Sequence, residues 1–151
     1  MMSNIEKRKI KVGDHLLYIE YGIYHQNKEL PVLVFLHDSW GCVEMWGNFP
    51  SKIQQITGLN TLVYDRQGHG QSSQFTIKER DTEYLHREAH EMIVLLDKLG
   101  IKNVIIYGHS DGATIALIAA SIFLNRVKGL VLEGVHSFIE SSGRASVKAT
   151  R

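Results

Sequence analysis

The sequence predicts an α/β fold in which helices flank a mostly parallel β-sheet. Short, continuous runs of apolar residues alternate along the chain with longer segments that have the period of a helix. Apolar runs of this kind are typical of parallel strands that are buried on both faces. Strands that alternate with helices favour a sheet covered on both sides, and 151 residues leave room for one domain with one core.

The chain opens with a predicted β-hairpin and a buried strand. Residues 10–12 and 16–21 are strand-like, and a Gly-Asp turn at residues 13–14 joins them. Residues 32–36 are apolar throughout, as expected of a strand buried on both faces. Residues 45–56 predict a helix, in which Pro50 has to lie near the first turn or cause a kink.

The same alternation continues to the end of the sheet. Residues 61–64 predict a second buried strand, and residues 83–99 predict the clearest helix, whose apolar side chains form one stripe. A strand at residues 104–107, a helix at residues 113–124 and a last strand at residues 130–132 complete the pattern.

The most informative motif is Gly108-His109-Ser110-Asp111-Gly112, directly after an apolar strand. It predicts a nucleophile elbow, a sharp turn from strand to helix that holds the serine hydroxyl above the sheet. The two glycines lack a Cβ, so strand and helix can pass close together. The helix N-terminus directs N–H groups at the reaction centre, and we expect the Asp111 N–H to be the first oxyanion donor. A glycine-rich turn with an incidental serine is the alternative.

Three further polar residues directly follow predicted strands, namely His37, Asp65 and His136. Because the carboxyl ends of parallel strands meet at one edge of a sheet, we expect them to share that edge with Ser110. Four polar side chains at one edge predict a site.

The segment His-Asp-Ser-Trp-Gly at residues 37–41 is where the second oxyanion donor would arise. We place this donor at the Ser39 N–H and expect His37, Trp40 and His136 to line the pocket. An ordinary loop, in which His37 satisfies backbone groups, is the alternative.

Asp65 opens a turn of sequence Asp-Arg-Gln-Gly-His-Gly-Gln-Ser at residues 65–72. We expect its carboxylate to hold the turn together through hydrogen bonds and Arg66, rather than to act in catalysis. The spacing is that of neither a P-loop nor a G-x-G-x-x-G loop, so it does not predict phosphate binding.

Composition excludes several classes of function. Seventeen basic and sixteen acidic residues leave the chain near neutral, so we expect no nucleic-acid partner and no membrane partner. Residues 1–11 lack the apolar stretch of a signal peptide, and the single cysteine, Cys42, suits a reducing compartment, so we expect a cytoplasmic protein. His86 and His90 share a helix face without a zinc motif around them. We expect no metal and no cofactor.

The three motifs resemble those of the α/β-hydrolase fold family, in the family's order and at the expected strand ends. Residues 108–112 resemble its elbow, residues 65–72 its D-R-x-G-x-G-x-S turn, and residues 37–41 its H-G-x-x-G oxyanion loop, with Asp38 where most members have glycine. The resemblance implies Ser110 as nucleophile and the backbone N–H groups of Ser39 and Asp111 as oxyanion donors. It implies hydrolysis of an ester or related acyl bond in a small-molecule substrate.

The family fold has eight strands, with the triad acid after the seventh and the histidine after the eighth, whereas this sequence predicts about six. We therefore expect residues 1–136 to form the N-terminal part of an α/β-hydrolase domain, and residues 137–151 a polar tail or the start of a cap helix. We expect such a chain to be weakly active or inactive alone. An open last strand would favour self-association.

Two other functions stay open. The chain could be a non-enzymatic truncated remnant, or a module that binds a small apolar ligand in the pocket. Among the histidines, His136 is the best candidate for a substitute base, because it follows the last predicted strand at the same edge as Ser110.

Overall fold

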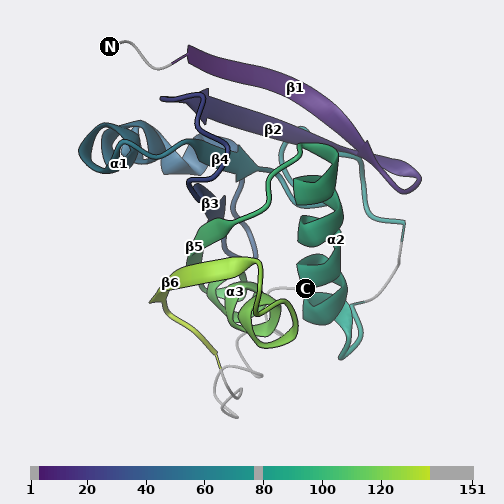
Figure 1. Cartoon of the computed structure of the whole chain (residues 1–151). Coiled ribbons are helices and arrows are strands. Elements are labelled where there is room, and N and C mark those ends of the chain that lie inside the picture. Colours follow the sequence, from purple (N-terminus) through teal and green to yellow (C-terminus); the bar gives the residue numbers. More distant parts are fainter. Residues whose placement is uncertain (1–3, 77–79, 137–151) are drawn as a thin grey trace.

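The computed structural model describes residues 4–76 and 80–136 (Figure 1). Within these ranges one six-stranded sheet has the strand order β1-β2-β4-β3-β5-β6. The pairs β3–β4, β3–β5 and β5–β6 are parallel, whereas β1–β2 and β2–β4 are antiparallel. The predicted α/β class with a mostly parallel sheet is confirmed. The predicted tail at residues 137–151 lies outside the described residues.

The N-terminal hairpin forms where the sequence predicts it, although its first strand begins six residues earlier than residue 10. β1 (Asn4–Val12) and β2 (His15–Ile23) form the hairpin, and Gly13 takes a φ of +57° in its turn, a conformation that favours glycine. β3 (Val32–Leu36) and β4 (Thr61–Tyr64) are buried at every position. Continuous apolar runs therefore mark the central strands correctly.

The single helix predicted at residues 45–56 is wrong, because the structure divides it into two. A 3-10 helix, η1 (Val43–Trp46), ends at Gly47, whose N–H donates to the Glu44 carbonyl at 3.1 Å. The α-helix α1 (Phe49–Thr57) then begins with Pro50 in its first turn, where the missing N–H leaves no hydrogen bond unmade.

The C-terminal half alternates helix and strand as predicted. α2 (Tyr84–Lys98) leads to β5 (Val104–His109), then to α3 (Asp111–Ile122) and β6 (Val127–Glu133). α3 begins two residues earlier than the predicted helix, because the chain turns from strand into helix at Ser110 itself.

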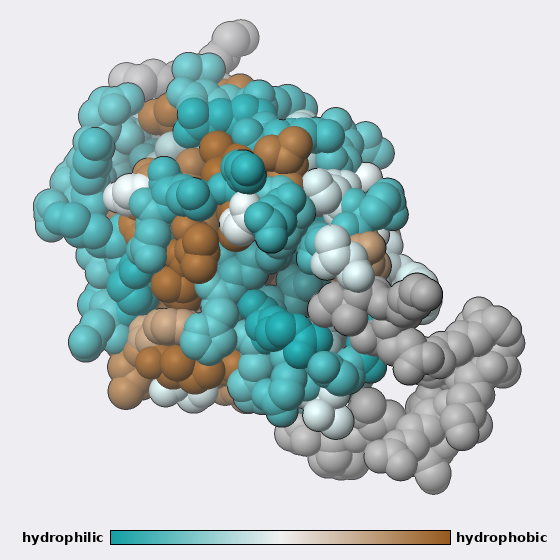
Figure 2. Space-filling view, turned by 90° about the vertical axis from the view of Figure 1, so that its right-hand side faces the viewer, coloured by the Kyte–Doolittle hydropathy of each residue, from teal (hydrophilic) through white to brown (hydrophobic). Residues whose placement is uncertain are grey.

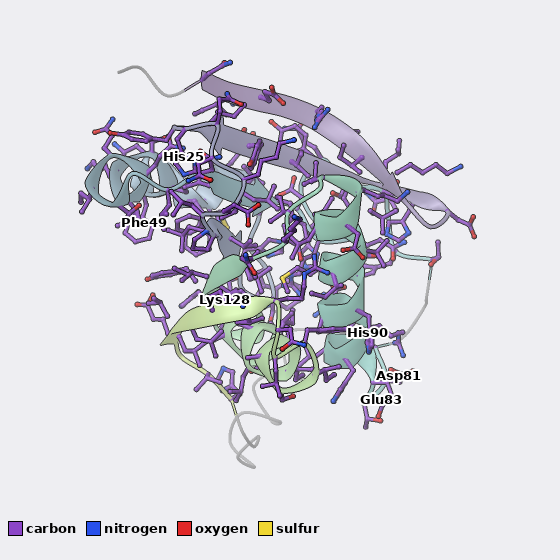
Figure 3. All side chains as sticks on the ribbon, in the orientation of Figure 1. His25, Phe49, Asp81, Glu83, His90 and Lys128 are labelled. Carbon is purple, nitrogen blue, oxygen red and sulfur yellow. The ribbon has the colours of Figure 1, made fainter. Side chains whose placement is uncertain are left out.

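The helices lie on both faces of the sheet. α2 and α3 cover one face, where their apolar side chains pack with Val34, Leu62 and Ile106 in the larger core cluster. α1 and η1 lie on the opposite face, where Phe35 packs among partly buried aromatic rings of Trp46, Phe49 and Tyr107. Figure 3 shows this arrangement through Phe49 on the α1 side and His90 on α2.

The surface is mixed in character. On the face shown in Figure 2, hydrophobic areas lie between larger hydrophilic ones. Exposed apolar side chains along the chain include Leu117, Ile122 and Leu124 in and after α3. In the described part of the chain, no helix has the length and apolar character needed to cross a bilayer.

Candidate active site

Ser110 lies at a strained turn between β5 and α3. Its φ of 54° and ψ of −117° make it the single non-glycine residue with positive φ within residues 4–76 and 80–136. Such a conformation costs about 1–3 kcal/mol and persists only where the surroundings impose it. The Ser110 N–H donates to the Glu133 carbonyl at 2.8 Å, and the Ser110 carbonyl accepts from the Ala113 N–H at 2.9 Å. The turn is thus held by β6 on one side and by the first turn of α3 on the other.

The glycines that flank Ser110 are required by close backbone approach. A Cβ on Gly108 would lie 2.6 Å from the Ala113 Cα, where strand and helix pass each other. A Cβ on Gly112 would lie 2.6 Å from the Leu36 carbonyl carbon, because α3 begins directly against the end of β3. Both distances are far inside van der Waals contact, so the G-x-S-x-G spacing reflects packing at this bend.

His136 lies beside the Ser110 hydroxyl. The distance from Ser110 Oγ to His136 Nε2 is 3.4 Å. Thr114 on α3 holds the histidine backbone, since its hydroxyl contacts both the His136 carbonyl and the His136 N–H at 3.3 Å. The imidazole is exposed, so it has access to solvent and to bound molecules.

The two amides predicted as oxyanion donors belong to segments that meet at the elbow. Asp111 is the first residue of α3, and its N–H belongs to the first turn, which has no intrahelical acceptor. Ser39 lies in the loop after β3, whose end packs against Gly112 at the elbow. These are the two amides that the sequence predicts as oxyanion donors.

His37 is a buried, neutral member of this loop. It is 2% exposed, and burial together with the nearby Arg66 charge lowers the pKa of its imidazole to about 3. The His37 Nε2 accepts from the Arg66 backbone N–H at 3.1 Å, and its Nδ1 lies 2.8 Å from the Asp38 carbonyl oxygen. His37 therefore supports the loop through backbone groups, as the alternative interpretation of the sequence holds.

The carboxylate of Asp65 holds two loops together. It accepts from the Val43 N–H at 2.6 Å and from the Gln71 N–H at 2.7 Å. Burial raises the pKa of the Asp65 carboxyl, and these two hydrogen bonds oppose that rise. The predicted structural role fits this geometry. Arg66, expected to assist Asp65, instead contacts the loop at residues 37–38 and Tyr84.

A cavity of about 280 Å³ opens at the same sheet edge. Its described lining is the set His37, Asp38, Gly41, Met45, Trp46, His109 and Glu133. Of the three residues expected in the pocket, His37 belongs to this lining, whereas His136 and Trp40, which is 83% exposed, do not. Trp46 is the tryptophan that contributes.

His109 is a site residue that the sequence analysis did not select. Its Nδ1 lies 3.4 Å from Asp38 Oδ2, so it joins the elbow to the loop after β3. The signal for this contact was present in the sequence, because His109 is the second residue of the elbow motif and Asp38 replaces a glycine.

His69 lies against the loop after β3, with its Nε2 3.0 Å from the Ser39 carbonyl oxygen, whereas His86 and His90 lie on α2. His86 contacts Glu83 at 3.8 Å, and the His90 ring meets the edge of Phe123 with centroids 5.1 Å apart. Figure 3 shows His90 on α2, near the end where Asp81 and Glu83 lie. Across the two described ranges, no cluster of three or more His, Cys, Asp or Glu side chains could hold a metal ion.

The fold and the strained serine define the class of protein. A sequence model described as the alpha/beta hydrolase fold matches residues 31–145, and this chain belongs to that family. It is 26% identical over 124 residues to an sn-1-specific diacylglycerol lipase of Danio rerio, a match that covers 82% of this chain and 38% of the relative. It is 28% identical over 105 residues to the zearalenone hydrolase of Cladophialophora bantiana, covering 70% of this chain and 39% of the relative.

Solved structures show the same fold. The 2-hydroxy-6-oxo-6-phenylhexa-2,4-dienoate hydrolase of Rhodococcus sp. strain RHA1 superimposes with a TM-score of 0.76 at 17% identity, covering 93% of this chain and 50% of that one. This chain therefore spans half or less of the length of these three proteins.

Proposed function

We propose that this chain carries the nucleophile side of a serine hydrolase site, which cleaves ester or related acyl bonds through Ser110. The observation that carries the proposal is the backbone of Ser110, since a positive φ at a non-glycine residue costs free energy and is concentrated at functional sites. The contact of its hydroxyl with His136 adds support.

The proposed reaction proceeds in two halves. In the first, Ser110 Oγ attacks the carbonyl carbon of the ester while its proton passes to His136 Nε2. The negative charge on the carbonyl oxygen is met by the N–H groups of Asp111 and Ser39. The alcohol then leaves with the proton from His136, and an acyl-Ser110 ester remains. In the second half, a water molecule attacks the acyl carbon while one of its protons passes to His136 Nε2. The acid then leaves as Ser110 Oγ takes that proton back from His136.

The class of substrate is proposed from the names of the relatives. One relative is named as a diacylglycerol lipase and another as a zearalenone hydrolase. We propose small esters as first substrates for this chain. A cavity of about 280 Å³ near Trp46 and Met45 is close to the lower limit of ligand pockets, about 300 Å³, and favours a small acyl group.

The test is covalent labelling with a fluorophosphonate, followed by mass spectrometry of the labelled peptide. We expect modification at Ser110, none in Ser110→Ala, and full modification in Ser121→Ala, which removes an exposed hydroxyl from the same helix. We expect His136→Ala to label more slowly than His86→Ala, which removes a half-exposed imidazole on α2 that contacts Glu83. A wild-type chain that folds but resists the reagent would exclude the nucleophile role of Ser110.

The second candidate is a module that binds a small ligand without turnover. The cavity favours it, because its lining combines Trp46 and Met45 with polar side chains. Binding of a small apolar ester that is unchanged in Ser110→Ala, with no product released by the wild type, would favour this candidate over hydrolysis.

A further inference from the structure

Arg66 is a buried cation that contacts the loop after β3. It is 0% exposed, and its Nη2 donates to the Asp38 carbonyl at 2.6 Å and to the His37 carbonyl at 3.2 Å. Its Nη1 donates to the Tyr84 hydroxyl on α2 at 2.9 Å. One nitrogen of the buried guanidinium therefore holds both carbonyls of the loop, and the planar group is fixed from the other side by Tyr84.

The Asp38 carbonyl receives a second hydrogen bond from His37. Because the Arg66 N–H donates to His37 Nε2, this nitrogen is unprotonated and the proton lies on Nδ1. The Nδ1–H then donates to the Asp38 carbonyl at 2.8 Å. The 3.3 Å approach of Arg66 Nη2 to Nδ1 brings two donors together and forms no hydrogen bond. The carbonyl oxygen of Asp38 is therefore held by two donors at once.

The direction of this carbonyl sets the direction of the Ser39 N–H. The two groups belong to one planar trans peptide unit, in which C=O and N–H point in opposite directions. With the Asp38 oxygen drawn inward toward Arg66, the Ser39 N–H points away from Arg66. The next carbonyl, that of Ser39, lies 3.0 Å from His69 Nε2, which limits rotation of the loop on its other side.

The charge of Arg66 also acts on this peptide unit. A cation at the oxygen polarises the amide and makes its N–H a stronger donor, because hydrogen bonds in a chain strengthen one another. This effect persists in the interior, where solvent does not screen it.

We propose that Arg66 is a positioning residue for catalysis, which orients and polarises the Ser39 N–H as an oxyanion donor through the carbonyl of Asp38. The effect of Arg66 on the reaction rate rests on the proposed function. Its effect on the Ser39 N–H rests on the loop geometry alone. Asp65-Arg66 thus connects the turn at residues 65–72 to the chemistry at Ser110.

The test uses Arg66→Lys in the whole chain, with Arg87→Lys as its control. Lysine keeps the positive charge but lacks the planar set of N–H donors of a guanidinium. Arg87 is an exposed arginine that pairs with Asp81, away from this loop. We expect kcat for a p-nitrophenyl ester to fall at least about tenfold with KM changed less than about twofold, since one oxyanion donor is worth up to about 10²–10³ in kcat. Arg87→Lys should leave both constants unchanged.

A second measurement separates this inference from the proposed function. In ¹H–¹⁵N NMR spectra, the Ser39 amide signal should shift in Arg66→Lys and stay in place in Arg87→Lys. If the wild type neither hydrolyses esters nor reacts with a fluorophosphonate, the proposed function fails and the amide signal alone decides the inference. A folded Arg66→Lys with wild-type kcat, or with an unmoved Ser39 amide where there is no turnover, would overturn it.

A milder variant covers the case in which Arg66→Lys does not fold. Tyr84→Phe keeps the ring in the core and removes only the oxygen that accepts from Arg66 Nη1. It should move the Ser39 amide signal in the same direction by a smaller amount. If folded Tyr84→Phe has the same Ser39 amide signal as the wild type, the inference is also overturned.

Discussion

Substitution of Gly108 by alanine tests the elbow geometry without touching the Ser110 side chain. The added Cβ would lie 2.6 Å from the Ala113 Cα and 2.6 Å from the Gly112 carbonyl carbon. Both neighbours are backbone atoms, so no side chain can rotate away to make room. β5 and α3 would have to separate, although each is fixed by the sheet and by the core cluster.

The loss of stability in Gly108→Ala is expected to be large, because no side chain can move to make room for the new Cβ. Overpacking costs about 1–3 kcal/mol, and we place Gly108→Ala at about 3 kcal/mol because only backbone movement can relieve it. For a chain of this length, 1 kcal/mol lowers Tm by about 2–4 °C, so a decrease of about 6–12 °C is expected. Labelling of Ser110 should also slow, because the same movement displaces the serine.

Gly129→Ala is the matched control, one strand away on β6. Its Cβ would lie 3.6 Å from Ile105 Cγ1 and Cγ2, which is ordinary contact, and Gly129 pairs with Ile105 in the register of β5 and β6. A glycine replaced at a compatible position gains about 0.4–1 kcal/mol. Urea denaturation followed by circular dichroism measures both variants. Equal free energies of unfolding for Gly108→Ala and Gly129→Ala would refute the close packing of strand and helix.

Three further predictions follow from single contacts. Ser110→Gly should raise the free energy of unfolding by about 1 kcal/mol, because glycine accepts the positive φ, whereas Ser121→Gly within α3 should lower it. Burial raises the pKa of the Glu88 carboxyl from 4.5 to about 7, so folding favours its protonated form and stability falls as pH rises from 4.5 to 7. In urea denaturation, the free energy of unfolding of Glu88→Gln should therefore exceed that of the wild type by about 1–3 kcal/mol at pH 8 and equal it at pH 4.5. A difference between the two proteins that does not change with pH would contradict this prediction. We propose that β6, which in the described chain pairs with β5 alone, mediates self-association. Sedimentation should show weaker association for Val131→Lys than for the wild type. A wild-type mass that stays that of one chain at all concentrations would exclude self-association.

The strands and the elbow could be predicted because their signals are local. Runs that are mainly apolar identified β3 and β4, which are buried at every position, and also β5, in which buried and partly buried residues alternate. Gly108 could be identified locally, because the close approach that requires it is to Gly112 and Ala113. Gly112 completed the motif, although the atoms that require it belong to the end of β3. The fold class followed from the alternation of these elements.

The pocket could not be predicted equally well, because it depends on contacts between distant segments. Trp40 and Trp46 both lie near the oxyanion loop in the sequence, but of the two only Trp46 lines the cavity, and Trp40 is exposed. The role of Arg66 depends on where α2 brings Tyr84 and on the path of residues 37–38. Neither placement leaves a periodic pattern in the sequence.

The replacement of a family glycine by Asp38 is compatible with the site for a physical reason. The turn at residues 65–72 holds this residue through its backbone carbonyl, which any amino acid provides. The side chain is free for other contacts, and its carboxylate accepts from the Trp40 N–H at 2.8 Å and lies 3.4 Å from His109 Nδ1. Asp38 therefore closes its own loop and ties it to the elbow, two tasks that a glycine at this position would leave undone.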